Sequence, residues 1–222
     1  MTSIIKTDYY EAFDYAGKAL GIVLTPFATD AVPGRDPLRT RSDRDENGMV
    51  DYYEEADEKS ERFWRMRLGE FLALHVVRED MLKEGMTPRR YDRTLLSEFP
   101  EGYKLWVHKK GDPHDPRKDF YLHGSRYVRQ FRSPMEFCLH LKWLANGKPM
   151  KPGDKPDCQC CYCDGSQRQG AISAKFGYYH PGHHDQNKKR KDKDKDGDGK
   201  GKRRSTASVF IPAKDYTKLN VA

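Results

Sequence analysis

The sequence lacks a hydrophobic run long enough to cross a membrane. Its longest apolar candidate, residues 19–28, contains Thr25 and Pro26 and falls short of the roughly 18 to 20 residues that a membrane helix needs. The opening residues, MTSIIKTDYYEAF, lack the basic and then apolar pattern of a secretory signal. We therefore expect neither secretion nor a membrane partner.

The sequence also lacks the motifs of the common enzyme classes. It contains no phosphate-cradling glycine loop, no nucleophile elbow and no H-E-x-x-H pair of histidines. We therefore expect a protein that is not an enzyme and has no small-molecule substrate.

Apolar residues are scarce, at 36% of the 222 residues against 34% charged residues, a low share for one well-buried globule. The formal net charge is +7, and the run KKRKDKDKDGDGKGKRR at residues 188–204 carries 10 basic and 4 acidic side chains, a net +6. Because this run has no apolar residue, it predicts a disordered linker. A nuclear-import or nucleic-acid tail is a compatible interpretation.

The first half of the chain gives uneven signals. Residues 1–30 are aromatic and aliphatic without a clean period, which leaves strand and short helix open. Residues 31–48 contain Pro33, Gly34 and Pro37 and predict a loop. Residues 55–84 have apolar positions on one face of a 3.6-residue period, which predicts a helix that Gly85 ends.

An acidic motif lies between this loop and this helix. Residues 43–54 fit the pattern D-x-D-x-N-G-x-x-D-x-x-E of a calcium-binding EF-hand loop. Such a loop needs a helix on each side, and the preceding AVPGRDPLRTRS has two prolines and no amphipathic pattern. An acidic loop leading into the helix is therefore the favoured interpretation, with calcium binding as a minor hypothesis.

Residues 99–147 predict a small α+β module. FPEGYKLWVH, DFYLHG and YVRQFRS alternate as three short strands. Ser133, Pro134 and Glu136 then supply an N-cap, a proline at the first helical position and a capping-box acid. The expected fold is a small twisted antiparallel sheet with one packed helix, which Asn146–Gly147 ends.

The outward face of this sheet is predicted to carry Asp119, Tyr121 and Arg132. An arginine steadied by a neighbouring carboxylate can contact guanine O6 and N7 with both arms of its guanidinium. An exposed polar face with an ordinary ion pair is an equally weighted alternative.

Four of the five cysteines lie within six residues. In a chain without a secretory signal, such a cluster indicates a metal site more than a disulfide framework, and thiolates suit Zn²⁺. Cys158, Cys160 and Cys163 are the favoured ligands, because adjacent Cys160 and Cys161 point in different directions. The fourth ligand is open among His140, Cys161 and the three histidines between residues 180 and 184, and His140 could equally be a packed core histidine.

The string FPEGY…KDFYL…QFRSPMEF resembles the methyl-CpG-binding domain. With the WRMRLGEFL helix upstream and EFCLHLKWLA and C-x-C-x-x-C downstream, residues 48–163 resemble the fungal cryptic loci regulator family of transcription-silencing proteins. The resemblance implies a nuclear subunit of a histone-deacetylase and chromatin-remodelling complex that silences heterochromatin. It also implies an α+β fold with an N-terminal helical extension and a structural zinc clip.

The resemblance also implies roles for single residues. Arg132 stands at the place of the family's second guanine-reading arginine, and Asp119 and Tyr121 stand where residues flank the methylated cytosine. The first guanine-reading arginine falls near Lys110, and lysine lacks the planar fork, which argues against methyl-CpG selectivity. We expect double-stranded DNA to be held mainly through phosphate contacts, from Lys104, Lys109, Lys110, Arg117 and Lys118.

The expected organisation has six parts: an N-terminal extension and acidic loop (1–48), a helical extension (49–98), the methyl-CpG-binding-like module (99–147), a Cys/His zinc-clip segment (148–187), the linker (188–204) and a tail (205–222). The leading hypothesis is a nuclear DNA-binding or chromatin adaptor module. The alternative is a scaffold subunit of a silencing complex that does not contact DNA.

Overall fold

The computed structural model describes residues 1–177, and it has the mixed α+β fold that the sequence predicts. The expected linker, the expected tail and the histidines between residues 180 and 184 lie outside the described residues. No helix in the described part of the chain is long and apolar enough to cross a membrane.

The first thirty residues, for which strand and helix were both open, form strands. β1 (Thr2–Lys6), β2 (Tyr10–Tyr15) and β3 (Ala19–Leu24) make an antiparallel meander. β5 (Arg93–Leu96) extends this sheet by pairing parallel to β3. The sheet therefore joins the N-terminus to a segment about seventy residues further along the chain.

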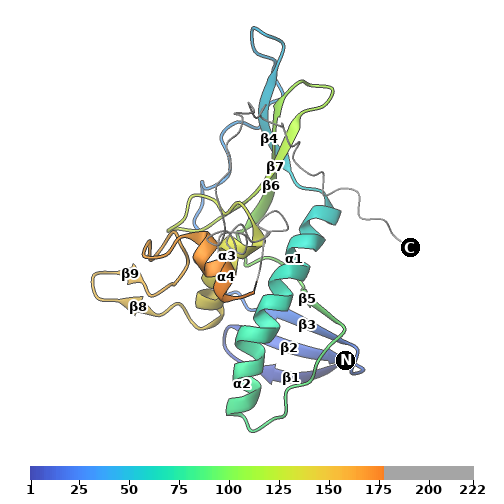
Figure 1. Cartoon of the computed structure of the whole chain (residues 1–222), viewed down its shortest axis with the longest axis vertical. Helices are drawn as coiled ribbons and strands as arrows, with labels where there is room; N and C mark the ends of the chain where they lie inside the picture. Colours follow the sequence, from blue (N-terminus) through green and yellow to red (C-terminus); the bar gives the residue numbers. More distant parts are fainter. Residues whose placement is uncertain (178–222) are drawn as a thin grey trace, which may run out of the picture. The chain divides into compact units, whose positions relative to one another are not determined.

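The predicted helix over residues 55–84 is confirmed and lies across this sheet (Figure 1). It consists of α1 (Glu58–Leu72), the wider π-helical turn η1 (Ala73–Val77) and α2 (Arg78–Lys83). The Asp57 carboxylate caps its start by accepting a hydrogen bond from Ser60 N at 2.8 Å. Gly69 allows α1 to approach β5 closely, since a Cβ atom there would lie 2.7 Å from the Leu96 backbone nitrogen.

The second sheet has the strand order β4-β6-β7, with β4 (Val50–Glu55), β6 (Lys104–Gly111) and β7 (Arg117–His123). β6 and β7 are the first two strands predicted for the central module. The prediction of a third strand at YVRQFRS is wrong. β4 completes the sheet instead, and it pairs with the edge of β6 opposite β7.

The Ser125 hydroxyl explains why the third strand does not form. It accepts hydrogen bonds from the backbone N–H groups of Tyr127 and Val128, both at 3.1 Å, and so turns the chain away from the β7 edge. Only Phe131 returns to the edge, through a two-bond bridge with Leu122. Phe131 is nevertheless fully buried.

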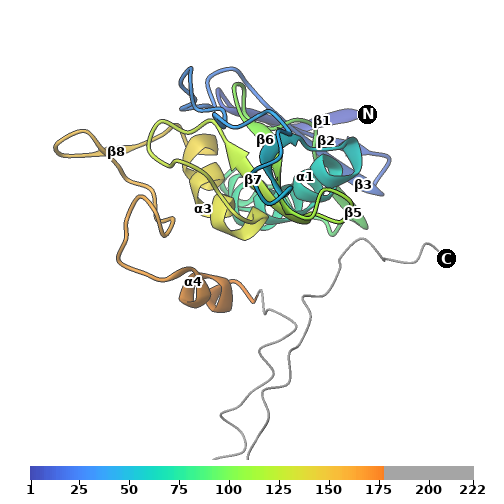
Figure 2. The same ribbon diagram turned by 90° about the horizontal axis from the view of Figure 1, so that it is seen from above.

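The predicted capped helix is confirmed as α3 (Pro134–Ala145). The Ser133 hydroxyl accepts from Glu136 N at 3.3 Å, while the Glu136 carboxylate accepts from Arg132 N at 2.7 Å. α3 packs against α1 beside β6 and β7 (Figure 2). The small hairpin of β8 (Met150–Lys151) and β9 (Lys155–Pro156) and the short helix α4 (Gln169–Lys175) follow.

Candidate zinc centre and charged sheet

One buried cluster of metal-ligating side chains lies in the described part of the chain. It brings together His140 of α3 with Cys158, Cys160 and Cys163 of the loop after β9, and all four ligand atoms lie within 4.8 Å of one another. The three cysteines are the ligands that the sequence favours, and His140 is one of the five residues left open for the fourth position. None of the chain's five cysteines, all within residues 1–177, forms a disulfide.

The distances in this cluster fit a tetrahedral zinc ion. His140 Nδ1 lies 3.5 Å from Cys158 Sγ, 3.5 Å from Cys163 Sγ and 4.0 Å from Cys160 Sγ. With Zn–S and Zn–N bonds of about 2.3 and 2.0 Å, a tetrahedron places nitrogen and sulfur about 3.5 Å apart. The donor set therefore suits zinc without rearrangement of the backbone.

The backbone of the loop is folded around these sulfur atoms. Cys160 N points at Cys158 Sγ at 3.5 Å, and Cys163 N points at Cys160 Sγ at 3.4 Å. Such N–H groups stabilise negative charge on sulfur, and the pKa of the Cys160 thiol is lowered by hydrogen bonds from Cys158 and Cys163 and by nearby His140. The loop is thus arranged for thiolates, the form that binds metal.

The other ring nitrogen of His140 faces a carboxylate from the N-terminal part of the chain. Asp30 Oδ2 lies 3.4 Å from His140 Nε2, and the Asp30 side chain is only 5% exposed. Ser125 donates to Asp30 Oδ2 at 2.8 Å, and the Tyr103 hydroxyl donates to Oδ1. This carboxylate fixes the proton of His140 on Nε2 and leaves Nδ1 free for a metal.

The electrostatic surroundings of His140 Nδ1 favour a bound cation. Burial alone would raise the pKa of Asp30, but hydrogen bonds with His140, Tyr103 and Ser125 lower it overall, so the carboxylate is charged. Burial alone would lower the pKa of His140, whereas the hydrogen bonds with Asp30, Cys160 and Cys163 raise it well above its ordinary value. The surroundings that attract a proton to Nδ1 would also attract Zn²⁺.

The two remaining cysteines lie outside the cluster. Cys161, which the sequence left open as a fourth ligand, is not in the group of four ligand atoms, and burial and the neighbouring Cys160 raise its pKa to about 11. Cys138 is buried in the core, where burial raises its pKa far above the ordinary range. Neither residue competes with the four ligands.

The sheet face expected to meet DNA is aromatic and partly covered. Trp106 and His123 lie on the same face as Asp119 and Tyr121 but are only 8% and 5% exposed. The His123 ring donates from Nδ1 to Arg35 O at 3.1 Å, so the loop before β4 lies over this end of the face. Tyr53 stacks on His108 with ring centroids 4.4 Å apart, and Tyr121 lies beside both.

Acidic residues pair with most of the basic residues expected to contact phosphates. On β4, Glu55 lies 3.1 Å from Lys104, Glu54 lies 2.5 Å from Lys109, and Asp51 lies 3.3 Å from Lys110. The register of the two strands sets these pairs, since β4 runs antiparallel to β6. Of the five predicted phosphate contacts, Lys118 alone has no ion-pair partner among residues 1–177, because Arg117 pairs within β7.

The predicted ion pair between Arg132 and Asp119 does not form. The Asp119 carboxylate bonds Arg117 instead, with Nε at 2.8 Å and Nη2 at 3.0 Å from its oxygens. Arg132 is exposed and follows the bridge residue Phe131 rather than a third strand. DNA contact by Arg132 and Tyr121 stays a prediction. The part of that prediction in which Asp119 holds the Arg132 guanidinium is wrong, because Asp119 bonds Arg117.

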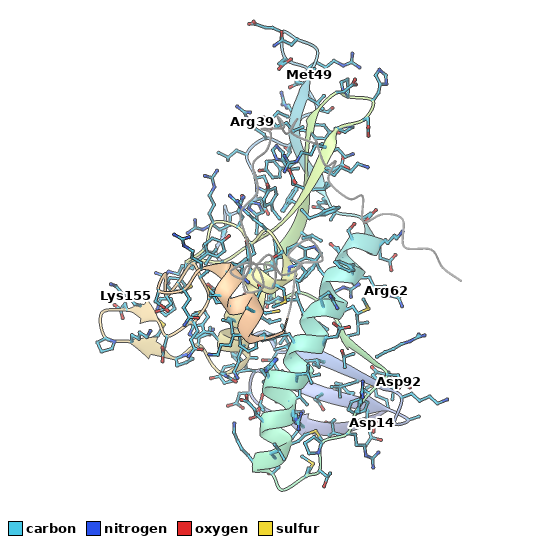
Figure 3. The ribbon with its side chains drawn as sticks, viewed as in Figure 1. Asp14, Arg39, Met49, Arg62, Asp92 and Lys155 are labelled. Carbon is cyan, nitrogen blue, oxygen red and sulfur yellow. The ribbon has the colours of Figure 1, made fainter. Side chains whose placement is uncertain are left out.

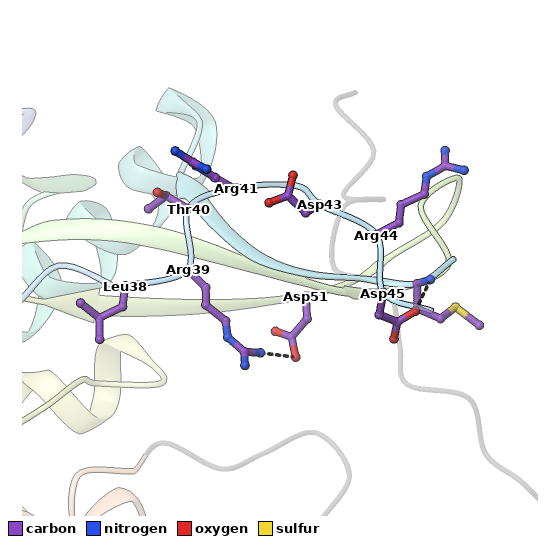
Figure 4. Close-up of a pocket in the computed structure, with 9 residues that line it drawn as sticks. Leu38, Arg39, Thr40, Arg41, Asp43, Arg44, Asp45 and Asp51 are labelled. Carbon is purple, nitrogen blue, oxygen red and sulfur yellow. Dashed lines mark hydrogen bonds and ion pairs between the residues drawn. The ribbon is translucent and has the colours of Figure 1, made fainter. Parts of the chain in front are cut away.

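The acidic motif at residues 43–54 is not an EF-hand. Its second half is strand β4, and the Asp45 carboxylate accepts from the backbone N–H groups of Asn47 and Met49 in a tight turn. Asp51 is engaged by His108, Lys110 and Arg39, and Figure 4 shows Arg39 turned toward Asp51 while Arg41 and Arg44 extend away from it. The EF-hand interpretation is therefore wrong, because no helix precedes the motif and a strand forms its second half.

Several functional residues were missed from the sequence. The β4 acids had a usable signal, since the alternating VDYYEE could have been matched as a strand to the lysine-rich β6. Asp30 had no local signal, because its role depends on contacts with residues 73 to 110 positions further along the chain.

Comparisons with known proteins agree with the sequence motifs. The family model described as transcription-silencing protein, cryptic loci regulator Clr2, matches residues 94–163. A solved structure of Clr2 bound to the Clr1 C-terminus matches with 20% identity and a TM-score of 0.41, covering 66% of this chain and 31% of that chain. The chain thus spans less than a third of that structure's length, and the comparison with curated proteins gave no match.

The matched segment contains the central strands, α3 and the four candidate metal ligands. The resemblance to the cryptic loci regulator family is thereby confirmed over residues 94–163, which match the family model, whereas the resemblance to the methyl-CpG-binding domain stays a prediction.

Proposed function

We propose that the chain is a zinc-stabilised adaptor module of a nuclear transcription-silencing complex, which docks protein subunits rather than holding DNA through its sheet. The match of residues 94–163 to a transcription-silencing family supports the silencing role. The ion pairs of the second sheet favour the docking of protein subunits and disfavour contact with DNA.

The observation that carries this choice is the charge balance of strands β4, β6 and β7. β4 contributes three acids, β6 contributes three lysines, and β7 contributes two basic residues and one acid. With neutral histidines, the three strands together therefore carry a net charge of only +1. Phosphate binding depends on unpaired positive charge that releases counterions from DNA. A lysine already bonded to glutamate gains little from a phosphate.

The metal centre supports a structural role and no catalysis. Catalytic zinc sites keep one position for water, whereas three cysteines and a histidine fill all four positions of a tetrahedral ion. A bound zinc would supply a covalent-like cross-link between α3 and the cysteine loop. Asp30 would extend that link to the N-terminal segment by holding His140 in place.

A DNA titration tests the proposal. The protein is the full chain in which the basic residues of run 188–204 are changed to glutamine, so that only the folded part is measured. We expect methylated and unmethylated CpG duplexes to bind no tighter than about 10 µM at physiological salt, within the range of non-specific contacts. Tighter binding would refute the docking proposal.

DNA contact remains the second candidate, because Lys118 and Arg132 are exposed without an ion-pair partner among residues 1–177. If this candidate holds, the complex is insensitive to methylation, weakens steeply with salt, and loses affinity in Arg132→Ala. Arg62→Ala, an exposed arginine on α1, is the matched control.

A further inference from the structure

A groove separate from the zinc centre and the charged sheet lies along the helix α1–η1–α2. It has a volume of about 540 Å³ and runs between the helix, the loop before β5 and the sheet of β3 and β5. Leu74, Val77 and Met81 supply its apolar helix wall. Leu74 is 53% exposed, an unusual position for a leucine that lines a groove.

Arginines form the rim of this groove. Its charged side chains are Arg78, Arg89, Arg90 and Glu70. Glu70 is bonded to Arg67 at 2.9 Å, and Arg89 lies 3.6 Å from Asp14. Arg78 and Arg90 are exposed and have no ion-pair partner within residues 1–177, so the rim offers two unpaired guanidinium groups beside an apolar floor.

The helix widens where it borders the groove. The five-residue π-helical turn η1 (Ala73–Val77) interrupts an otherwise regular helix and contributes three groove residues. π-Helical turns are rare, since their hydrogen bonds have poorer geometry than those of a regular α-helix. Where such turns occur inside an α-helix, they frequently lie at functional sites.

We propose that this arginine-rimmed groove binds a partner-protein segment that carries apolar anchors flanked by aspartate or glutamate. The proposal rests on the adaptor function above and names the chemistry of the docked partner. Apolar anchors would pack on Leu74 and Met81, and acidic side chains would pair with Arg78 and Arg90.

The chain's own C-terminal residues do not have this chemistry. Residues 205–222 contain the apolar VFIP but carry a net charge of +1, and they follow a run of net +6. Two unpaired arginines would repel them, whereas an acidic partner has the complementary charge.

A peptide-library selection tests the proposal. The bait is the zinc-loaded full chain with the 188–204 run neutralised to glutamine, and the probe is a random library of 12-residue peptides. Peptides that also bind the double variant Leu74→Ser, Arg90→Glu are removed. We expect the retained peptides to combine apolar residues with net negative charge.

Affinities of one retained peptide then locate the site. Arg78→Glu with Arg90→Glu and, separately, Leu74→Ser should each weaken binding at least tenfold. Arg62→Glu, on the N-terminal half of α1 (Figure 3), and Leu82→Ser, 57% exposed on α2 outside the groove, should leave affinity unchanged.

Four outcomes would overturn the proposal. They are the absence of enriched peptides, enrichment of neutral or basic peptides, equal loss of binding in the control variants, and displacement of the peptide by duplex DNA or by a second copy of the chain. DNA affinity is measured separately, so a failure of the groove and a failure of the adaptor proposal give different results.

Discussion

The candidate zinc centre and the charged sheet hold polar groups in opposite ways. At the zinc centre, His140 and Asp30 are almost fully buried, and each polar atom has a defined partner from a distant part of the chain. On the sheet, the pairs of Lys104 with Glu55 and Lys110 with Asp51 keep much of their side chains in solvent. Buried networks specify a structure, whereas exposed ion pairs mainly cancel charge.

Loss of a metal ligand should give the largest effect. Cys163→Ser should abolish zinc binding and cost about 4 kcal/mol or more, as expected for loss of a structural metal, a fall in Tm of roughly 10 °C. Metal analysis of purified protein and thermal unfolding measure both. Cys161→Ser is the control and should keep one zinc per chain; equal zinc content in both variants would exclude this cluster as the site.

Loss of the carboxylate behind His140 should give the next largest effect. Asp30→Asn keeps the shape but removes the charge that holds His140, and we expect zinc affinity to fall about 10- to 100-fold. Competition with a zinc-binding dye measures the affinity. Asp8→Asn, an exposed aspartate, is the control, and an unchanged affinity in Asp30→Asn would separate the N-terminal segment from the metal centre.

Removal of the β4 acids should leave the lysines of β6 without ion-pair partners and free to bind phosphates. In the neutralised-tail chain, changing Asp51 to asparagine and Glu54 and Glu55 to glutamine frees three lysines. We expect duplex DNA to bind about tenfold more tightly, with the slope of log K against log salt steeper by up to about 3. Neutralising Glu58, Glu61 and Glu84, exposed or partly exposed acids of the helical segment, is the control for total charge. A variant indistinguishable from this control would mean that the pairs do not mask the sheet.

The smallest effect concerns pH and the covered end of the sheet face. Burial lowers the pKa of His123, so the folded protein disfavours a proton that the unfolded chain accepts near its ordinary value. The stability from neutral His123 is therefore complete above the ordinary pKa, about 6.5, and is lost as the pH falls below it. Thermal unfolding between pH 7.5 and 5.5 should show a steeper loss in the native protein than in His123→Gln, whereas His114→Gln, in an exposed loop, should match the native slope.

Local patterns predicted much of the fold. The helix over residues 55–84, the strands β6 and β7, and the capped helix α3 follow from periodicity and capping residues that act over a few positions. The third strand failed because one hydroxyl, that of Ser125, binds the next turn more favourably than a strand edge would. β4 was missed because its acids fit a known loop motif, and only pairing with β6 makes them a strand.

The sequence by itself indicated Cys158, Cys160 and Cys163 as candidate metal ligands, since closely spaced cysteines carry a recognisable chemistry, but it left the fourth position open. It also identified the resemblance to the transcription-silencing family, because that resemblance depends on short strings of residues, most of them within residues 94–163. Only the tertiary structure decided which charges are cancelled, because strand register places the β4 acids against the β6 lysines, 49 to 59 residues apart in the chain. It alone brought Asp30 behind His140 and opened the arginine-rimmed groove, since packing between distant segments creates both.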